Sequence, residues 1–101
     1  MAGSFSTLTA GFGMSGMDVA EVERIGRQMQ TEANNIQQLL NRVAQQVKIA
    51  EDAWKGQDAT RFLDDWNTRQ RQVQAVQTSL DQLGRRALQE AQQQRKVSGV
   101  N

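Results

Sequence analysis

Apolar residues recur at alternating intervals of four and three along the first half of the chain. This repeat consists of Met29, Ala33, Ile36, Leu40, Val43, Val47, Ala50 and Trp54. A period of 3.5 residues held over several heptads is typical of a helix that packs along one seam. Asp18 precedes the pattern as a candidate N-cap, and Glu21 stands at the spacing of a capping box. We therefore predict a helix over about 18–54.

The second half repeats the pattern after an interruption at Gly56. Its apolar row consists of Phe62, Trp66, Val73, Val76, Leu80, Leu83 and Ala87, with Arg69 as the one polar member. This row predicts a second helix over about 58–91. A connection as short as 55–57 requires the two helices to run antiparallel. The predicted fold is all-α, an antiparallel helix-turn-helix hairpin over 18–91.

The two ends of the chain lack this pattern. Residues 1–17 are rich in Gly, Ser and Thr, and Phe5, Leu8 and Phe12 are their only large apolar residues besides Met. We predict a flexible N-terminal tail that could dock on another surface. Residues 92–101 are expected to form fraying helix and a C-terminal tail.

A single hairpin covers each seam from one side only. Four further apolar residues widen the stripes towards a second contact: Leu39, Ile49, Leu63 and Leu88. Most helices gain their stability from packing, and few two-helix proteins bury enough area alone. Dimerisation of two hairpins into a four-helix bundle is the expected solution, with a self-contained hairpin as the alternative. The residues predicted for the dimer seam are Met29, Ile36, Leu40, Val43, Val47, Phe62, Trp66, Val73, Val76, Leu80 and Leu83.

The composition argues against an enzyme. The chain contains no Cys, no His and no Tyr, which removes the commonest nucleophilic, acid–base and metal-binding side chains. Adjacent acids such as Asp64-Asp65 and Glu51-Asp52 diverge by about 100° on a helix and do not form one site. We therefore expect no catalytic residues, no metal site and no cofactor.

Charge and hydropathy also limit the partners. The net charge is +1, and Arg85-Arg86 and Arg95-Lys96 lack the interleaved aromatic residues of a nucleic-acid surface, so no nucleic acid is expected. No apolar run approaches the roughly 20 residues that span a bilayer. The N-terminus lacks the basic and apolar regions of a general secretory signal. Export would need another route.

The tripeptide Trp54-Lys55-Gly56 falls at the predicted tip of the hairpin. Gly56 can adopt the left-handed conformation that ends a helix. Trp54 stands in the last turn of the first helix, where cover by the second helix runs out. Two interpretations of Trp54 remain open, a core residue only or a core residue that also serves recognition. Trp66 is expected in the core.

This arrangement resembles the WXG family of small type VII (ESX) secretion proteins, the early-secreted-antigen-like proteins. The resemblance covers 18–91 and rests on Trp-X-Gly at mid-chain, on Ala53, Ala59 and Phe62 beside it, and on the helical repeat. It implies hairpins that pair as four-helix bundles and are exported folded, without a cleaved signal peptide. The implied localisation is the cytoplasm before export and the exterior afterwards.

The chain departs from the family in one respect. The family's export signal places a Tyr four residues before Asp or Glu after the second helix, and this chain has no Tyr. The resemblance then implies a heterodimer with another WXG-family protein that carries the Tyr motif. Trp54 and Gly56 would supply half of a composite export signal, read by the type VII secretion ATPase. The alternatives are a non-secreted structural or adaptor bundle and a membrane-active effector, and the narrow, Gln-rich stripes argue against direct membrane insertion.

Overall fold

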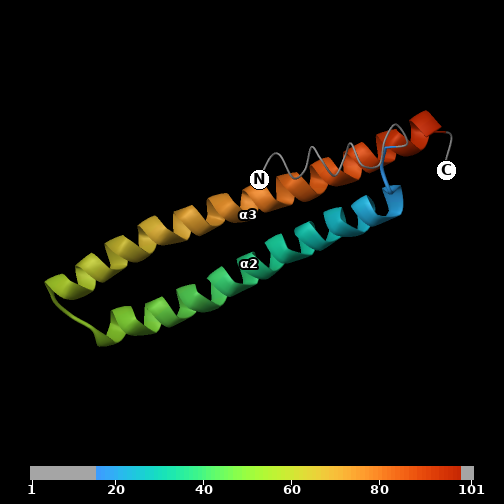
Figure 1. Ribbon diagram of the computed structural model, residues 1–101. Helices are drawn as coiled ribbons and strands as arrows, with labels where there is room; N and C mark the ends of the chain where they lie inside the picture. The colour runs from blue at the N-terminus through green and yellow to red at the C-terminus, as the bar shows by residue number, and fades with distance from the viewer. Residues whose placement is uncertain (1–15, 99–101) are drawn as a thin grey trace.

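The computed structural model describes residues 16–98 and consists there of two long helices. Helix α2 spans Val19–Ala53 and helix α3 spans Gln57–Ser98. The helices lie side by side and antiparallel, joined by a short turn at one end of the molecule (Figure 1). The predicted all-α helical hairpin is confirmed. The predicted N-terminal tail falls almost entirely on residues 1–15, which lie outside the described part.

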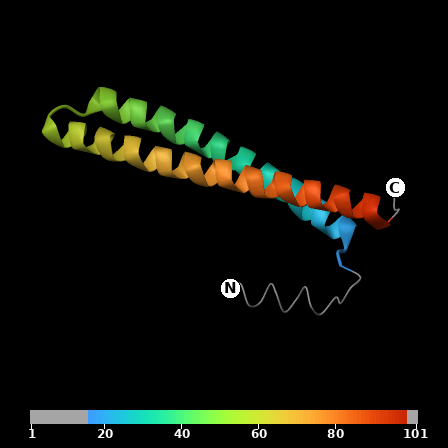
Figure 2. The ribbon, with the colours of Figure 1, turned by 90° about the horizontal axis from the view of Figure 1, so that it is seen from above.

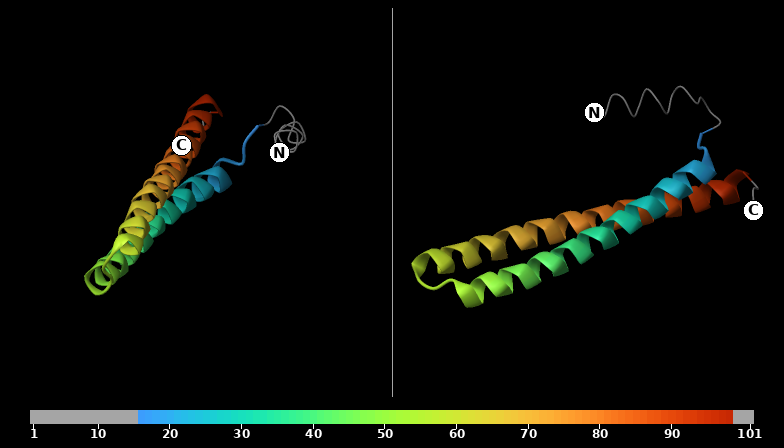
Figure 3. Two further views of the ribbon diagram at one scale, coloured as in Figure 1. Left: turned by 90° about the vertical axis from the view of Figure 1, so that its left-hand side faces the viewer. Right: turned by 90° about the horizontal axis from the view of Figure 1, so that it is seen from below.

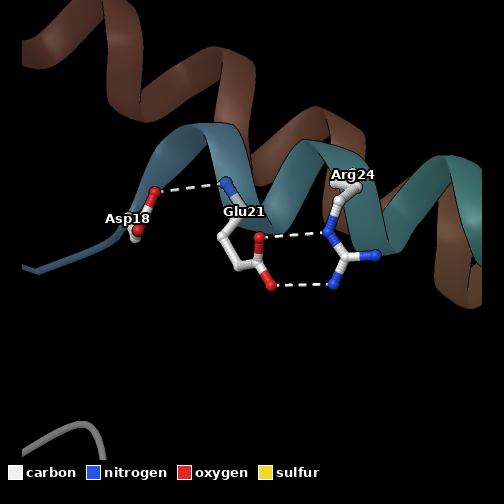
Figure 4. Close-up of polar contacts among 3 residues, drawn as sticks. All are labelled: Asp18, Glu21 and Arg24. Atoms are coloured by element: carbon white, nitrogen blue, oxygen red, sulfur yellow. Dashed lines mark hydrogen bonds and ion pairs between the residues drawn. The ribbon is translucent and has the colours of Figure 1, made fainter.

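Helix α2 begins where the sequence predicts. The Asp18 carboxylate accepts a hydrogen bond of 3.1 Å from the backbone N–H of Glu21, which satisfies one of the free donors of the first turn (Figure 4). The reciprocal half of the capping box is not seen. The Glu21 carboxylate instead accepts two hydrogen bonds from the Arg24 guanidinium, at 3.0 and 2.7 Å. These bonds hold the pKa of Glu21 below its usual value.

Helix α3 continues past the predicted end at residue 91 and reaches Ser98. Two features account for the difference. The segment after Glu90 consists mainly of Gln, Ala and Arg, which are good helix formers. It also packs on α2, because Ala91 is fully buried and Arg95 binds Glu23 across the helix pair. Tertiary contacts thus extend the helix beyond the apolar repeat.

The interface between the helices is built from small residues. Gly26 on α2 faces Gly84 on α3 so closely that a Cβ built on Gly84 would lie 2.6 Å from the Gly26 carbonyl oxygen. Ala33 and Ala91 are buried one heptad further along each helix. Figures 2 and 3 show α2 crossing α3 towards the open end of the hairpin. Gly26 is needed for this close approach, because a Cβ there would lie 2.9 Å from the Gly84 carbonyl oxygen.

The hairpin has little core of its own. Its Cα atoms extend only 14 Å in the thinnest direction, which corresponds to a single layer of helices. The buried apolar residues of the described chain are Ala33, Leu40, Ala59 and Ala91, and no large side chain there is fully buried. Neither described helix contains a stretch apolar enough to cross a membrane. Most of the large apolar side chains are left on the surface.

Candidate functional site: an apolar face and an aromatic tip

The large apolar side chains gather on one side of the hairpin. The line of closest contact runs through Gly26, Ala33 and Leu40 on α2 and through Ala59 and Gly84 on α3. Residues three positions after such a residue lie about 60° away around the helix. Because the helices run in opposite directions, the same rotation on each leads to the same side of the hairpin. This side, the apolar face, carries Ile25, Met29, Ile36, Leu39 and Val43 of α2, and Phe62, Val73, Val76, Leu80 and Leu83 of α3.

Exposure separates the predicted seam residues into three groups. Leu40 is 6% exposed and is buried within the hairpin itself. Val76 and Leu83, by contrast, are 58% and 57% exposed, and Phe62 and Val73 are also open to solvent. The remaining predicted seam residues are half-buried at the edge between the two helices, namely Met29, Ile36, Val43, Val47, Trp66 and Leu80.

The four residues expected to widen the stripes do not all share this face. Leu39 lies on it, at the outer rim. Ile49 is 69% exposed and lies about 160° from the contact line, on the outer side of α2. Leu63 and Leu88 are half-buried on the other side of the hairpin, and Leu88 packs against Gly26. Helical spacing alone does not reveal these differences, because it does not fix which side the partner helix covers.

The opposite side of the hairpin holds an ion pair between the two helices. Arg95 donates two hydrogen bonds to Glu23, at 3.0 and 2.6 Å, and both side chains are partly buried. These bonds hold the pKa of the Glu23 carboxyl below its usual value and raise that of Arg95. The other described ion pairs join residues three or four apart on one helix. The Glu23–Arg95 pair links α2 to α3 near the open end of the hairpin.

The tip of the hairpin presents an aromatic pair. Trp54 stands just outside α2, in an extended conformation with φ −127° and ψ 120°. Its ring lies 5.3 Å from that of Phe62, tilted by 39°, which is an ordinary aromatic contact. Trp54 remains 42% exposed. The sequence marks Phe62 as a seam residue and as a residue near the Trp-X-Gly motif, but not as the contact of the Trp54 ring. Its position about two turns after the break is the signal that could have placed it there.

Gly56 adopts the predicted positive φ, but in a different role. Its φ is 107°, and a Cβ built on it would meet no atom within 4 Å. The first helix has already ended at Ala53. The Gly56 carbonyl accepts the first hydrogen bond of the second helix, from the backbone N–H of Thr60 at 3.3 Å. Gly56 therefore starts α3 rather than closing α2, because the extended Trp54 already turns the chain away from the first helix.

The described residues that gather at the tip and on the apolar face are aromatic or aliphatic. No group of three or more His, Cys, Asp or Glu there is arranged to hold a metal ion. The side chains that gather, Trp54 and Phe62 at the tip and the aliphatic residues of the apolar face, are suited to covering another apolar surface.

Comparison with known proteins identifies one family. The family described as "WXG100: Proteins of 100 residues with WXG" matches residues 16–96. No curated protein and no solved structure matches the chain.

Proposed function

The chain belongs to the WXG100 family of small secreted proteins of type VII secretion, and from this premise we propose that it is exported as the partner subunit of a dimer. Its Trp54-Lys55-Gly56 turn would contribute half of a composite export signal. The other half, the Tyr motif, would come from a second WXG-family protein, because this chain has no Tyr. The secretion ATPase would read the combined surface.

The observation that carries the proposal is the exposed aromatic tip. Trp54 lies outside the helices and keeps 42% of its surface in contact with solvent. A large indole held at a tip by one aromatic neighbour, and not enclosed by the hairpin, favours recognition over a purely structural role. Gly56, which has no side chain and open space around it, leaves room for another segment to approach.

The apolar face supports the dimeric part of the proposal. Large exposed apolar surfaces mark interaction sites, and this one follows both helices. A second hairpin laid on it would give the two-layer packing of a four-helix bundle. The partner's C-terminal segment could then reach the Trp54 turn if the two hairpins pair antiparallel.

Secretion measurements test the composite signal. The secreted and retained amounts of both subunits are measured for wild type, Trp54→Ala and a partner deletion. Trp54→Ala should lower export of both subunits about tenfold or more while their association inside the cell stays near normal. Lys55→Ala is the matched control, because Lys55 is an exposed neighbour outside the aromatic pair, and it should leave export unchanged. Normal secretion of this chain after partner deletion would refute the proposal.

A further inference from the structure

The apolar face continues to the open end of the hairpin, away from the Trp54 turn. Its open-end half consists of Ile25 and Met29 of α2 and of Leu80 and Leu83 of α3. Ile25 is 38% exposed and Leu83 is 57% exposed, although both are large aliphatic side chains. An exposed apolar surface of this kind is suited to a further apolar segment.

Two carboxylates border this half of the face, and both have partners on their own helix. Glu32 accepts hydrogen bonds from Gln28 and Asn35, at 3.1 and 3.0 Å. Glu90 accepts one from Arg86 at 3.1 Å. A segment that covers the open-end half therefore needs apolar side chains but no charged group of its own.

The chain enters α2 from the side of the apolar face. Gly16 has a φ of 81°, and a Cβ built on it would lie 3.6 Å from Nε2 of Gln94 near the end of α3. Gln94 follows Leu83 by eleven positions, which is about three full turns, so both lie on the same side of α3. The start of α2 and the end of α3 meet at the open end (Figure 1). Residues 1–15 thus start next to the open-end half of the face.

Residues 1–15 carry a third apolar row with the spacing of the other two. Met1, Phe5, Leu8 and Phe12 are separated by four, three and four positions, and no residue of the segment is charged. On a helix these four side chains would share one side, with Ser6 and Thr7 on the other. Three glycines in the segment disfavour a helix on its own, so the row needs a surface to pack against.

The length of the segment fits the open-end half of the face. A helix from Gly16 back to Met1 would extend about 22 Å at 1.5 Å per residue. By the same measure Ile25 lies about 14 Å from Gly16 along α2, and Leu80 lies about 21 Å from Gln94 along α3. A segment tethered beside a surface has an effective concentration there in the millimolar range. This favours its own hairpin over a second copy in dilute solution.

We propose that residues 1–15 dock on the open-end half of the apolar face of their own hairpin, through Phe5, Leu8 and Phe12. The docked segment shields this surface from water while the chain is unpaired. A partner hairpin would need the same surface, so the segment would compete with it for binding. The docking itself is intramolecular and does not rest on the export function proposed above.

Disulfide formation in the full-length chain tests where the segment lies. The chain contains no Cys, so an engineered pair reports one contact only. Thr9→Cys is combined either with Ala87→Cys or with Gln89→Cys, and intramolecular oxidation is followed at low protein concentration. Ala87 lies about 60° from the contact line towards the apolar face, whereas Gln89 is exposed and lies about 140° from it in the other direction. The pair with Ala87→Cys should form at least tenfold faster.

Variants of the segment separate docking from simple tethering. Phe5→Ser with Phe12→Ser should reduce the ratio of the two oxidation rates to below threefold, because the apolar anchors are lost. Ser6→Ala with Thr7→Ala is the matched control and should preserve the ratio. Equal rates in the unmodified segment, or a ratio that the two serines leave unchanged, overturn the proposal. Disulfides that join two chains instead of one also overturn it.

Hydrogen exchange tests the same contact without engineered cysteines. Backbone amides of 22–30 and 80–94 should exchange at least fivefold more slowly in wild type than in the variant with Phe5→Ser and Phe12→Ser, because docking suppresses local opening at this end. Amides of 40–50 and 60–70, nearer the tip, should exchange equally in both proteins. Equal exchange over 22–30 and 80–94 would overturn the proposal, while the secretion assay with Trp54→Ala judges the proposed function separately.

Discussion

At the scale of single residues, Trp54 and Gly56 have different roles at the tip of the hairpin. Gly56 supplies a backbone conformation, with φ 107°, that an ordinary side chain rarely adopts. Trp54 supplies a surface, because its indole rests on Phe62 and remains partly exposed. The stability of the hairpin should therefore depend more on the glycine, which has no side chain, than on the much larger tryptophan.

Gly56→Val should destabilise the hairpin by about 2 kcal/mol, because a β-branched residue is strained at positive φ even where space is open. Trp54→Ala should cost about 1 kcal/mol, the scale of one exposed aromatic pair. Urea unfolding of both variants measures the difference. If Trp54→Ala proved the more damaging, Trp54 would be a core residue and the recognition role would lose its basis.

At the scale of the helices, the hairpin is held by backbone contact as much as by side chains. The carbonyl groups of Gly26 and Gly84 come so near to the opposing helix that neither position has space for a methyl group. Small buried residues continue this close packing at Ala33 and Ala91, and Glu23–Arg95 fastens the open end. Because the helices approach so closely, large apolar side chains do not fit between them along this line, and most of them lie beside it.

Gly84→Ala should destabilise the hairpin, although the same substitution stabilises an ordinary helix. In an ordinary helix, replacing Gly by Ala gains roughly 0.5–1 kcal/mol. Here the new methyl would lie 2.6 Å from a backbone oxygen that cannot rotate away, so the helices must separate. We expect a net loss of about 2 kcal/mol by thermal unfolding. Ser79→Ala, exposed on the same helix, is the control and should be neutral or slightly stabilising; a raised melting temperature for Gly84→Ala would contradict the crossing geometry.

At the scale of the whole molecule, the proposed dimer would make the hairpin one half of a two-layer structure. The described hairpin is a single layer of helices in which no large side chain is fully buried, and no second layer of that part of the chain covers its apolar face. Covering that face with another hairpin should bury more than about 2,000 Å² in total, as in obligate complexes.

Val76→Asp should separate assembly from folding. Val76 is 58% exposed in the hairpin, so the substitution leaves the hairpin helical but buries an unpaired charge when a partner covers the face. Co-purification with the co-expressed Tyr-bearing partner should fall about a hundredfold, the equivalent of about 3 kcal/mol. Ile49→Asp is the control, because Ile49 is 69% exposed on the outer side of α2, and it should leave the complex intact. Leu40→Asp differs from both substitutions. Leu40 is buried within the hairpin, so a charge at this position should unfold the hairpin itself.

The sequence by itself determined the two helices, their antiparallel order, the cap at Asp18 and the positive φ of Gly56. These depend on local propensity and on a heptad period that one helix carries alone. The tertiary structure decided which flank of each row faces the other helix, that Gly26 meets Gly84, that α3 extends to Ser98, and that Phe62 lies beside Trp54. A period of 3.5 residues defines a stripe but not its rotation about the helix axis, and small residues at one register allowed the helices to approach along a narrow line. Most of the larger apolar residues beside that line were thereby left on one open face.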